Sequence, residues 1–179
     1  MCYIIFRNVT CYLFLIGEKP MNYNKEINKT NVEFGDMPPQ AFLLGLLSAF
    51  DNRYQAAADE YLKEITWKQF FAIICINLCK EAPTINELSD VMGSSHQNVK
   101  QILLRLEKKG FIATFEDEKD KRKQRIYVTD AARNFLEAND NNGQQSQYVI
   151  GRIFEGIDEK SLMTTIQTIM KMERNLNEL

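Results

Sequence analysis

The chain has 179 residues, enough for one domain with a real hydrophobic core and an attached oligomerisation element. A hydrophobic fraction of 45% and a charged fraction of 26% exclude wholesale disorder and fibrous repeats. With only 8 Gly and 4 Pro, the composition favours a mostly helical fold over a loop-rich β-sandwich. The net charge of −2 excludes a non-specific polycation but is compatible with a local basic site.

The four cysteines and the single histidine restrict the available chemistry. Cys2, Cys11, Cys75 and Cys79 form no CxxC pair, and His96 alone cannot complete a Cys/His zinc set or a Ser-His-Asp triad. We therefore expect no metal, no cofactor and no catalytic residues, so that the protein is not an enzyme. The cysteine spacing is unlike a disulfide framework, which indicates a reducing compartment, the cytoplasm.

The first 17 residues are strongly apolar and allow two interpretations. One is a membrane anchor or signal peptide, but Arg7 and Thr10 interrupt the stretch, and it lacks a basic start and an A-x-A cleavage site. The other is that translation begins at Met21, and that the preceding residues are not native or form a loose tail. We favour the second, and expect residues 1–37 to be a poorly ordered extension without a membrane role.

Two helices are predicted next. Apolar residues at steps of three and four predict a long first helix over residues 38–65. Its stripe consists of Leu43, Leu46, Phe50, Tyr54, Ala57 and Tyr61. Thr66 and Gln69 form a capping box for a helix over 67–80, which is apolar nearly all round and should therefore be buried.

Two short helices follow in quick succession. Thr84 with Glu87 forms a capping box for the first of them, which reaches Met92 and ends in a turn at Gly93. A third capping box, Ser94 with Gln97, begins the second helix. Gly110 then lies where a helix C-cap belongs.

A hairpin is predicted after this helix pair. Residues 111–116 and 124–129 alternate like strands, and a charged tip joins them. Thr129 can cap the next helix. The order helix, turn, helix, hairpin predicts a winged helix-turn-helix module over residues 66–133.

The C-terminal residues 134–179 are expected to be helical again. Residues 139–147 have poor helix propensity and form either a loop or the weak middle of a long helix. From Ile150 to Leu176, apolar residues resume helical spacing.

The second helix of the pair has two distinct faces. Val99, Ile102, Leu103 and Leu106 form the face that we expect to be buried. The opposite face carries Gln97, Asn98, Gln101, Arg105 and Lys108. Gln, Asn and Arg are the side chains that pair with base edges in a major groove, and hydroxyls at a helix N-terminus suit a phosphate.

Positive charge is concentrated on this part of the chain. Residues 94–125 hold nine basic and five acidic residues, net +4, whereas the rest holds 13 and 19, net −6. A polar helix face or a charged hairpin tip is common by itself in small domains. Both in this order, with the charge so divided, favour DNA binding.

Two rival functions remain. A winged helix that binds protein instead of DNA would carry an apolar or acidic face on the second helix, which this chain does not. An enzyme would need a second histidine, a Gly-rich phosphate loop or a metal set.

Residues 84–133 resemble the winged-helix core of the MarR family of bacterial transcription regulators. The resemblance rests on LEKKGFI at the junction of helix and wing and on the D-x-R wing signature, here Asp120-Lys121-Arg122. The flanks extend it to about residues 38–178. Two departures are Ala132 or Arg133, where the family often has Gly, and the stretch 139–147, where the family usually has an unbroken helix.

The resemblance implies a homodimer in which residues 38–65 and 134–179 are dimerisation helices, and a repressor of an inverted-repeat operator in double-stranded DNA. Arg122 would enter the minor groove, with Asp120 holding the tip by a salt bridge. The expected DNA-binding residues are Ser94, Ser95, His96, Gln97, Asn98, Lys100, Gln101, Arg105, Lys121, Arg122, Lys123 and Arg125.

The resemblance also implies a small amphipathic or phenolic effector, because many members of the family release DNA on binding one. Tyr54, Tyr61, Trp67 and Phe70 are candidate wall residues. Aromatic residues at helical spacing are more typical of a core, which is the interpretation that we favour. We interpret Cys75 and Cys79 likewise as core residues and not as redox sensors.

Overall fold

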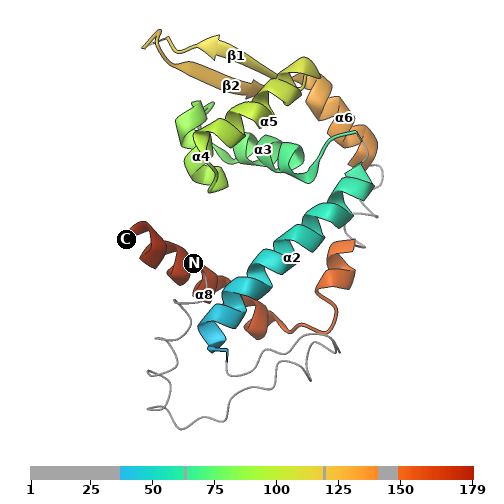
Figure 1. Cartoon of the computed structure of the whole chain (residues 1–179). Coiled ribbons are helices and arrows are strands. Elements are labelled where there is room, and N and C mark those ends of the chain that lie inside the picture. Colours follow the sequence, from blue (N-terminus) through green and yellow to red (C-terminus); the bar gives the residue numbers. More distant parts are fainter. Residues whose placement is uncertain (1–36, 63, 119, 141–148) are drawn as a thin grey trace, which may run out of the picture. The chain divides into compact units, whose positions relative to one another are not determined.

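The computed structural model describes residues 37–62, 64–118, 120–140 and 149–179, with the side chains of Tyr61, Asn139 and Asp140 outside this set. Figure 1 shows the elements in order: α2 (Pro39–Leu62), α3 (Trp67–Leu78), α4 (Ile85–Met92), α5 (His96–Lys108), β1 (Ile112–Glu116), β2 (Gln124–Val128), α6 (Asp130–Asp140) and α8 (Glu159–Asn177). The mainly helical architecture with one antiparallel hairpin confirms the predicted fold class. None of the helices described is long and apolar enough to cross a membrane.

The chain divides into two compact units within α3, residues 1–71 and 72–179. In the first unit, the predicted long helix is α2. Its apolar stripe is only partly covered, because the side chains of Leu46 and Phe50 are 42% and 51% exposed. The predicted extension, residues 1–37, lies outside the described residues except for Met37.

The start of α3 confirms the first capping box. The Thr66 amide donates to Gln69 Oε1 at 3.1 Å, and the Gln69 amide donates to Thr66 Oγ1 at 3.3 Å. The helix ends at Leu78, two residues earlier than predicted, and this leucine is 74% exposed. The prediction of burial nearly all round is therefore wrong for the last two residues, Asn77 and Leu78, which lie at the surface.

The second unit holds a compact apolar core contributed by every element from α3 to α6. Its buried members are Ala72, Ile73, Cys75, Ile76, Leu88, Val99, Ile102, Leu103, Leu106, Ile112, Ile126, Val128 and Ala132. Cys75 is thus a core residue, whereas Cys79 is only half-buried. The period-3.6 stripes of the helices and the alternate residues of the strands meet in this one core.

The turn between α4 and α5 corrects the position of one predicted cap. The Ser94 amide donates to the Ser89 carbonyl at 3.1 Å, so Ser94 belongs to the turn that ends α4, beside Gly93 at φ 59°. The N-cap of α5 is the next residue, Ser95, whose hydroxyl accepts from the Asn98 amide. The predicted cap at Ser94 is therefore displaced by one residue, to Ser95.

The end of α5 passes directly into the hairpin. Gly110, at φ 72°, donates to the Glu107 carbonyl at 2.8 Å, and the Phe111 amide donates to the Leu106 carbonyl at 3.0 Å. These are the two hydrogen bonds of a Schellman motif, in which glycine supplies the left-handed residue without steric cost. Thr129, after β2, caps α6 as predicted, by accepting from the Ala132 amide at 3.3 Å.

In the hairpin, Ile112 faces Val128 and Glu116 faces Gln124. Ile112, Ile126 and Val128 are buried against the helices. The outer side of the same two strands exposes an aromatic pair, Phe115 and Tyr127, with ring centroids 5.5 Å apart.

The C-terminal segment is helical but has no buried face. Asp158 caps α8 by accepting from the Ser161 amide at 2.9 Å, yet no residue of α8 is buried. Its large exposed apolar side chains are Met163, Ile166, Ile169, Met170 and Leu176. The predicted weak stretch lies mostly outside the described residues, which resume at 149 with a short helix over 149–153.

The core predicts a sharp contrast between two leucines of α5. Leu106 is 0% exposed and Leu104 is 49% exposed. Leu106→Ala should lower the free energy of unfolding by about 2–5 kcal/mol because it leaves a cavity. Leu104→Ala, the matched control, should change it by about 0.5 kcal/mol or less. Urea denaturation measures both, and equal losses would contradict the burial described above.

Candidate nucleic-acid interface

α5 presents the polar face that its sequence predicts. Val99 and Leu106 are fully buried, and Ile102 and Leu103 are 6% and 7% exposed, so the rotation of the helix about its own axis is fixed. The side chains that the burial of this face leaves in solvent include Gln97, Asn98, Lys100, Gln101, Arg105 and Lys108. α5 therefore offers donors and acceptors in register with the helical repeat.

The N-terminus of α5 is organised by two serines. Ser95 caps the helix, and the Asn98 side-chain amide donates to Ser94 Oγ at 2.8 Å. His96, in the first turn, is exposed. The positive end of the helix dipole and its unpaired amides make such a terminus suitable for a phosphate.

The tip of the hairpin is shaped by two aspartates. Asp117 Oδ1 accepts from the Asp120 amide at 2.8 Å, and Asp120 Oδ1 accepts from the Arg122 amide at 3.2 Å. The Asp117 amide also donates to the Lys123 carbonyl at 2.9 Å. Aspartate stabilises turns in this way because its carboxylate takes the place of a main-chain acceptor.

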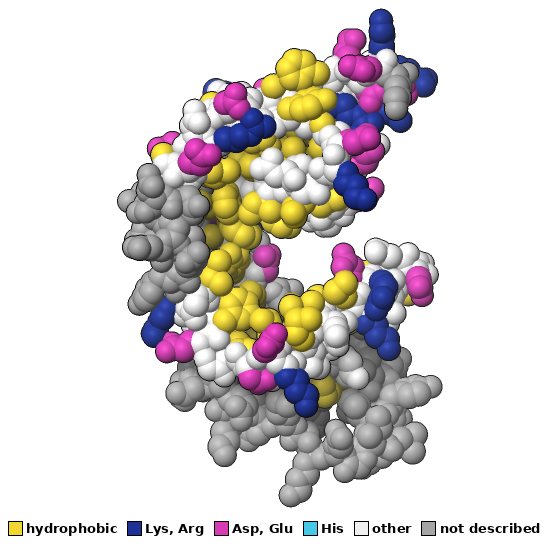
Figure 2. Space-filling view, turned by 180° about the vertical axis from the view of Figure 1, so that it is seen from behind, with side chains coloured by type: hydrophobic (Ala, Val, Ile, Leu, Met, Phe, Trp, Pro, Cys, Tyr) yellow, Lys and Arg dark blue, Asp and Glu magenta, His cyan; other side chains and the backbone are white. Residues whose placement is uncertain are grey.

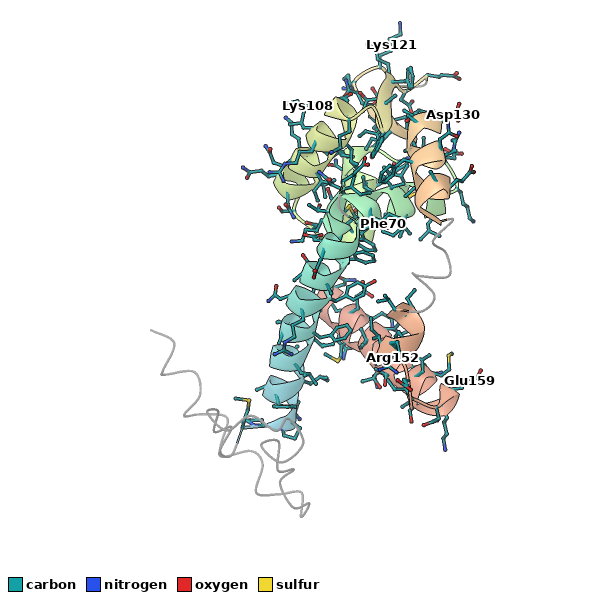
Figure 3. All side chains as sticks on the ribbon, turned by 90° about the vertical axis from the view of Figure 1, so that its right-hand side faces the viewer. Phe70, Lys108, Lys121, Asp130, Arg152 and Glu159 are labelled. Carbon is teal, nitrogen blue, oxygen red and sulfur yellow. The ribbon has the colours of Figure 1, made fainter. Side chains whose placement is uncertain are left out.

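The cations of the tip point into solvent. Arg122 pairs with Asp120 at 3.1 Å, as expected, but its side chain is 90% exposed, so the pair contributes little to stability. The hydrogen bonds that Asp120 accepts from Arg122 lower the pKa of the Asp120 carboxyl. The bond from the Arg122 side chain has the larger effect and the bond from its amide the smaller. Lys121 and Lys123 are exposed as well. Figure 3 shows Lys121 extending from the end of the hairpin and Lys108 extending from α5, and Figure 2 shows the charged side chains crowded at this tip.

Arg125 is placed differently from the expectation that it contacts DNA. Its Nε donates to Asp117 Oδ2 at 2.6 Å, and its Nη1 donates to Glu87 Oε2 and to the Ala82 carbonyl, both at 3.0 Å. Its side chain is 22% exposed. The hydrogen bond to Asp117 raises the pKa of the Arg125 guanidinium further. Arg125 is thus engaged by protein groups on both sides of the hairpin.

Glu87 connects this arginine to the cap of α4. The Glu87 carboxylate accepts from the Thr84 amide at 2.7 Å and from the Thr84 hydroxyl at 3.0 Å. These two hydrogen bonds are the main causes that lower the pKa of Glu87, and the charge of Arg125 adds to them. The sequence identified Glu87 as a capping residue but missed its second partner, because 38 positions separate it from Arg125.

The two parts of the candidate interface are joined within one unit. β1 lies beside α5, and Thr114 Oγ1 donates to Glu107 Oε1 at 3.1 Å. One unit of the structure therefore carries both the exposed face of α5 and the exposed cations of the wing tip. Among the residues that the structure describes, no group of three or more His, Cys, Asp or Glu side chains could hold a metal ion.

The aromatic residues considered for an effector site lie in the first unit. Tyr54 meets Trp67 edge-on at 4.7 Å between ring centroids, and Trp67 contacts Phe70 at 5.8 Å and Phe71 at 6.0 Å. The described members are half-buried, and burial raises the pKa of Tyr54. The Tyr61 side chain lies outside the described residues.

A capped helix pair followed by a hairpin that packs on its second helix defines a winged helix-turn-helix protein. Residues 65–123 match the model of the MarR family. The chain has the fold of the winged-helix transcription regulators of that family. The resemblance recognised in the sequence is confirmed.

Solved structures agree with this assignment. The chain is similar to a MarR/EmrR family transcriptional regulator from Acinetobacter sp. ADP1, with a TM-score of 0.67 and 14% identity over 80% of this chain and 100% of that one. It is similar to MepR of S. aureus in a DNA complex, with a TM-score of 0.64 and 17% identity over 79% of this chain and 99% of that one. It is also similar to CouR from Rhodococcus jostii RHA1 bound to p-coumaroyl-CoA, with a TM-score of 0.60 and 19% identity over 71% of this chain and 88% of that one.

The capping box predicts a measurable carboxyl pKa. The pKa of Glu87 should lie below its ordinary value of about 4.3, so its stabilising effect is present above that pH and is lost as the pH falls through the lower folded value. Thr84→Val removes the hydroxyl and should raise the pKa part of the way back, since the main-chain hydrogen bond remains. An NMR titration that follows the carboxyl carbon of Glu87 measures this pKa. Thr165→Val on α8 is the control and should leave the pKa of Glu87 unchanged. An unchanged Glu87 pKa in Thr84→Val would contradict the capping geometry.

Proposed function

We propose that this protein is a sequence-specific regulator of transcription that binds double-stranded DNA as a cytoplasmic homodimer and represses its target genes. The observation that carries the proposal is that one unit exposes both the polar face of α5 and the cations of the wing tip. A helix of this width fits the major groove, and a cationic hairpin tip suits the adjacent phosphates and minor groove.

The proposed contacts divide into two kinds. Base edges would be read by Gln97, Asn98, Gln101 and Arg105. Phosphates and the minor groove would be met by Ser94, Ser95, His96, Lys100, Lys121, Arg122 and Lys123. The similar MepR structure holds DNA, which supports a DNA-binding role for this fold.

A homodimer is supported by the apolar side chains that the described chain leaves uncovered. α8 has no buried residue, and α2 exposes Leu44, Leu46 and Phe50. Helices of this length with an apolar stripe need a partner, and a second copy related by a two-fold axis supplies one for each stripe. Residues 38–65 and 134–179 would then form the dimer interface.

The proposal includes an effector site among the aromatic residues of the first unit. The similar CouR structure holds p-coumaroyl-CoA. Tyr54, Trp67 and Phe70 here pack on one another and suit a core as well as the wall of a site for an amphipathic or phenolic molecule. Isothermal titration with phenolic acids, with and without DNA, distinguishes the two roles.

The alternative is a winged-helix module that binds protein. The exposed pair of Phe115 and Tyr127 on the outer side of the hairpin favours it, since aromatic side chains are common at protein interfaces. Fluorescence anisotropy with the DNA upstream of the protein's own gene decides between the functions. Saturable binding that exceeds binding to shuffled DNA supports the regulator, and equal binding to both sequences would exclude it.

Substitutions on α5 should separate specificity from affinity. Gln101→Ala should weaken binding to the preferred site by about 1–3 kcal/mol while leaving binding to shuffled DNA unchanged, because it removes a base contact. Lys100→Ala should weaken binding to the preferred site and to shuffled DNA alike. It should also reduce the slope of the logarithm of the binding constant against the logarithm of the salt concentration by about 0.9. Equal losses on both DNAs for Gln101→Ala would show that α5 does not read the sequence.

The dimer makes a geometric prediction about the operator. Two copies of α5 should lie about 34 Å apart, so footprinting should show two inverted half-sites centred about 10 bp apart on one face of the duplex. Ile166→Glu in α8 should convert the dimer to a monomer in sedimentation and abolish the paired footprint. A wild-type chain that sediments as a monomer at micromolar concentration would contradict the proposal.

A further inference from the structure

Arg125 lies between the wing and the start of α4. Here the segment before α4 runs along β2, with the Ile126 amide donating to the Pro83 carbonyl at 2.9 Å. Arg125 reinforces this contact from the neighbouring position by donating to the Ala82 carbonyl and to Glu87. β2 is therefore attached to α4 and to the residues before it by one main-chain and two side-chain hydrogen bonds.

The same guanidinium also reaches the opposite side of the hairpin. Asp117, directly after β1, accepts from Arg125 Nε at 2.6 Å, and its other oxygen accepts from the Asp120 amide. Asp120 in turn holds the amide and the Nε of Arg122. Glu87, Arg125, Asp117, Asp120 and Arg122 form a continuous relay of hydrogen bonds from the cap of α4 to the tip of the wing.

Exposure is lowest in the middle of this relay. The side chains of Arg125 and Asp117 are 22% and 12% exposed, whereas that of Glu87 at the α4 end is 56% exposed and those of Asp120 and Arg122 toward the tip are 28% and 90% exposed. The inner pair is consequently less screened by solvent than the outer one. A two-stranded ribbon is only marginally stable by itself, so the attachment of β2 to α4 and the residues before it affects the direction of the wing tip.

We propose that Arg125 is a positioning residue for DNA binding, which sets the position of Arg122 through Asp117 and Asp120 and does not itself contact DNA. This inference rests on the proposed function. Arginine suits the position because its planar fork donates in separate directions to two carboxylates and a carbonyl, whereas the lysine ammonium is a point charge on a flexible stem.

The first test is made without DNA. In two-dimensional NMR spectra of the full chain, Arg125→Gln and Asp117→Asn should both shift the amide signals of Lys121 and Arg122. Lys108→Gln, which removes an exposed cation of α5, should leave the Arg122 signal in place. Unmoved Arg122 signals in Arg125→Gln and Asp117→Asn, with the thermal transition intact, would overturn the relay.

The second test is a double-mutant cycle on the upstream DNA. Arg125→Gln should weaken binding by about tenfold, the size of one lost contact, and should have almost no further effect in an Arg122→Ala background. Losses that multiply in the double variant would mean that Arg125 touches DNA itself, and would overturn the proposal. Arg125→Lys should recover only part of the affinity, and full recovery would show that charge alone matters, which also overturns it.

The two tests separate this inference from the proposed function. If the wild-type chain binds no DNA, the proposed function fails, while the NMR shifts still decide whether Arg125 sets the position of the tip. If the wild-type chain binds and the losses multiply, the function stands and the relay fails.

Discussion

Burial of one face of α5 is the constraint on which the rest of the module depends. Val99, Ile102, Leu103 and Leu106 take up the inner side of the helix, with exposures between 0% and 7%. Because a helix repeats every 3.6 residues, covering these four positions turns Gln97, Gln101 and Arg105 outward. The same packing determines where the hairpin begins, because the Leu106 carbonyl accepts a hydrogen bond from the Phe111 amide at the start of the wing.

Hydrogen bonds at the ends of the helices hold the parts of the module in register. The turn from α4 to α5 uses Gly93 in the left-handed region and Ser95 as a cap, and α5 ends at Gly110 with two returning amide bonds. Each cap is worth only about 0.5–2 kcal/mol. Their role is mainly directional, because each one determines where the chain leaves a helix and so where the next element begins.

The charges of the wing have two distinct roles. Lys121, Arg122 and Lys123 are exposed and suit a phosphate backbone, whereas Arg125, only two residues beyond Lys123, is engaged by Asp117 and Glu87. A count of basic residues treats all of them alike. The net charge of +4 over residues 94–125 therefore includes one cation that the protein's own carboxylates already engage.

Local patterns in the sequence were sufficient for the elements and for the class of protein. The capping boxes at Thr66 and Thr84, the cap at Thr129, the glycine after α5 and the alternating strands all act over four residues or fewer, so their signals can be read along the chain. Contacts between distant positions could not be read in this way. The cap at Ser95 instead of Ser94 depends on how α4 ends, and the exposure of Leu78 depends on where the surface of the core lies. The contacts of Arg125 were decided by tertiary structure alone, because the packing of β2 against the start of α4 brings its guanidinium to a carboxylate 38 positions away.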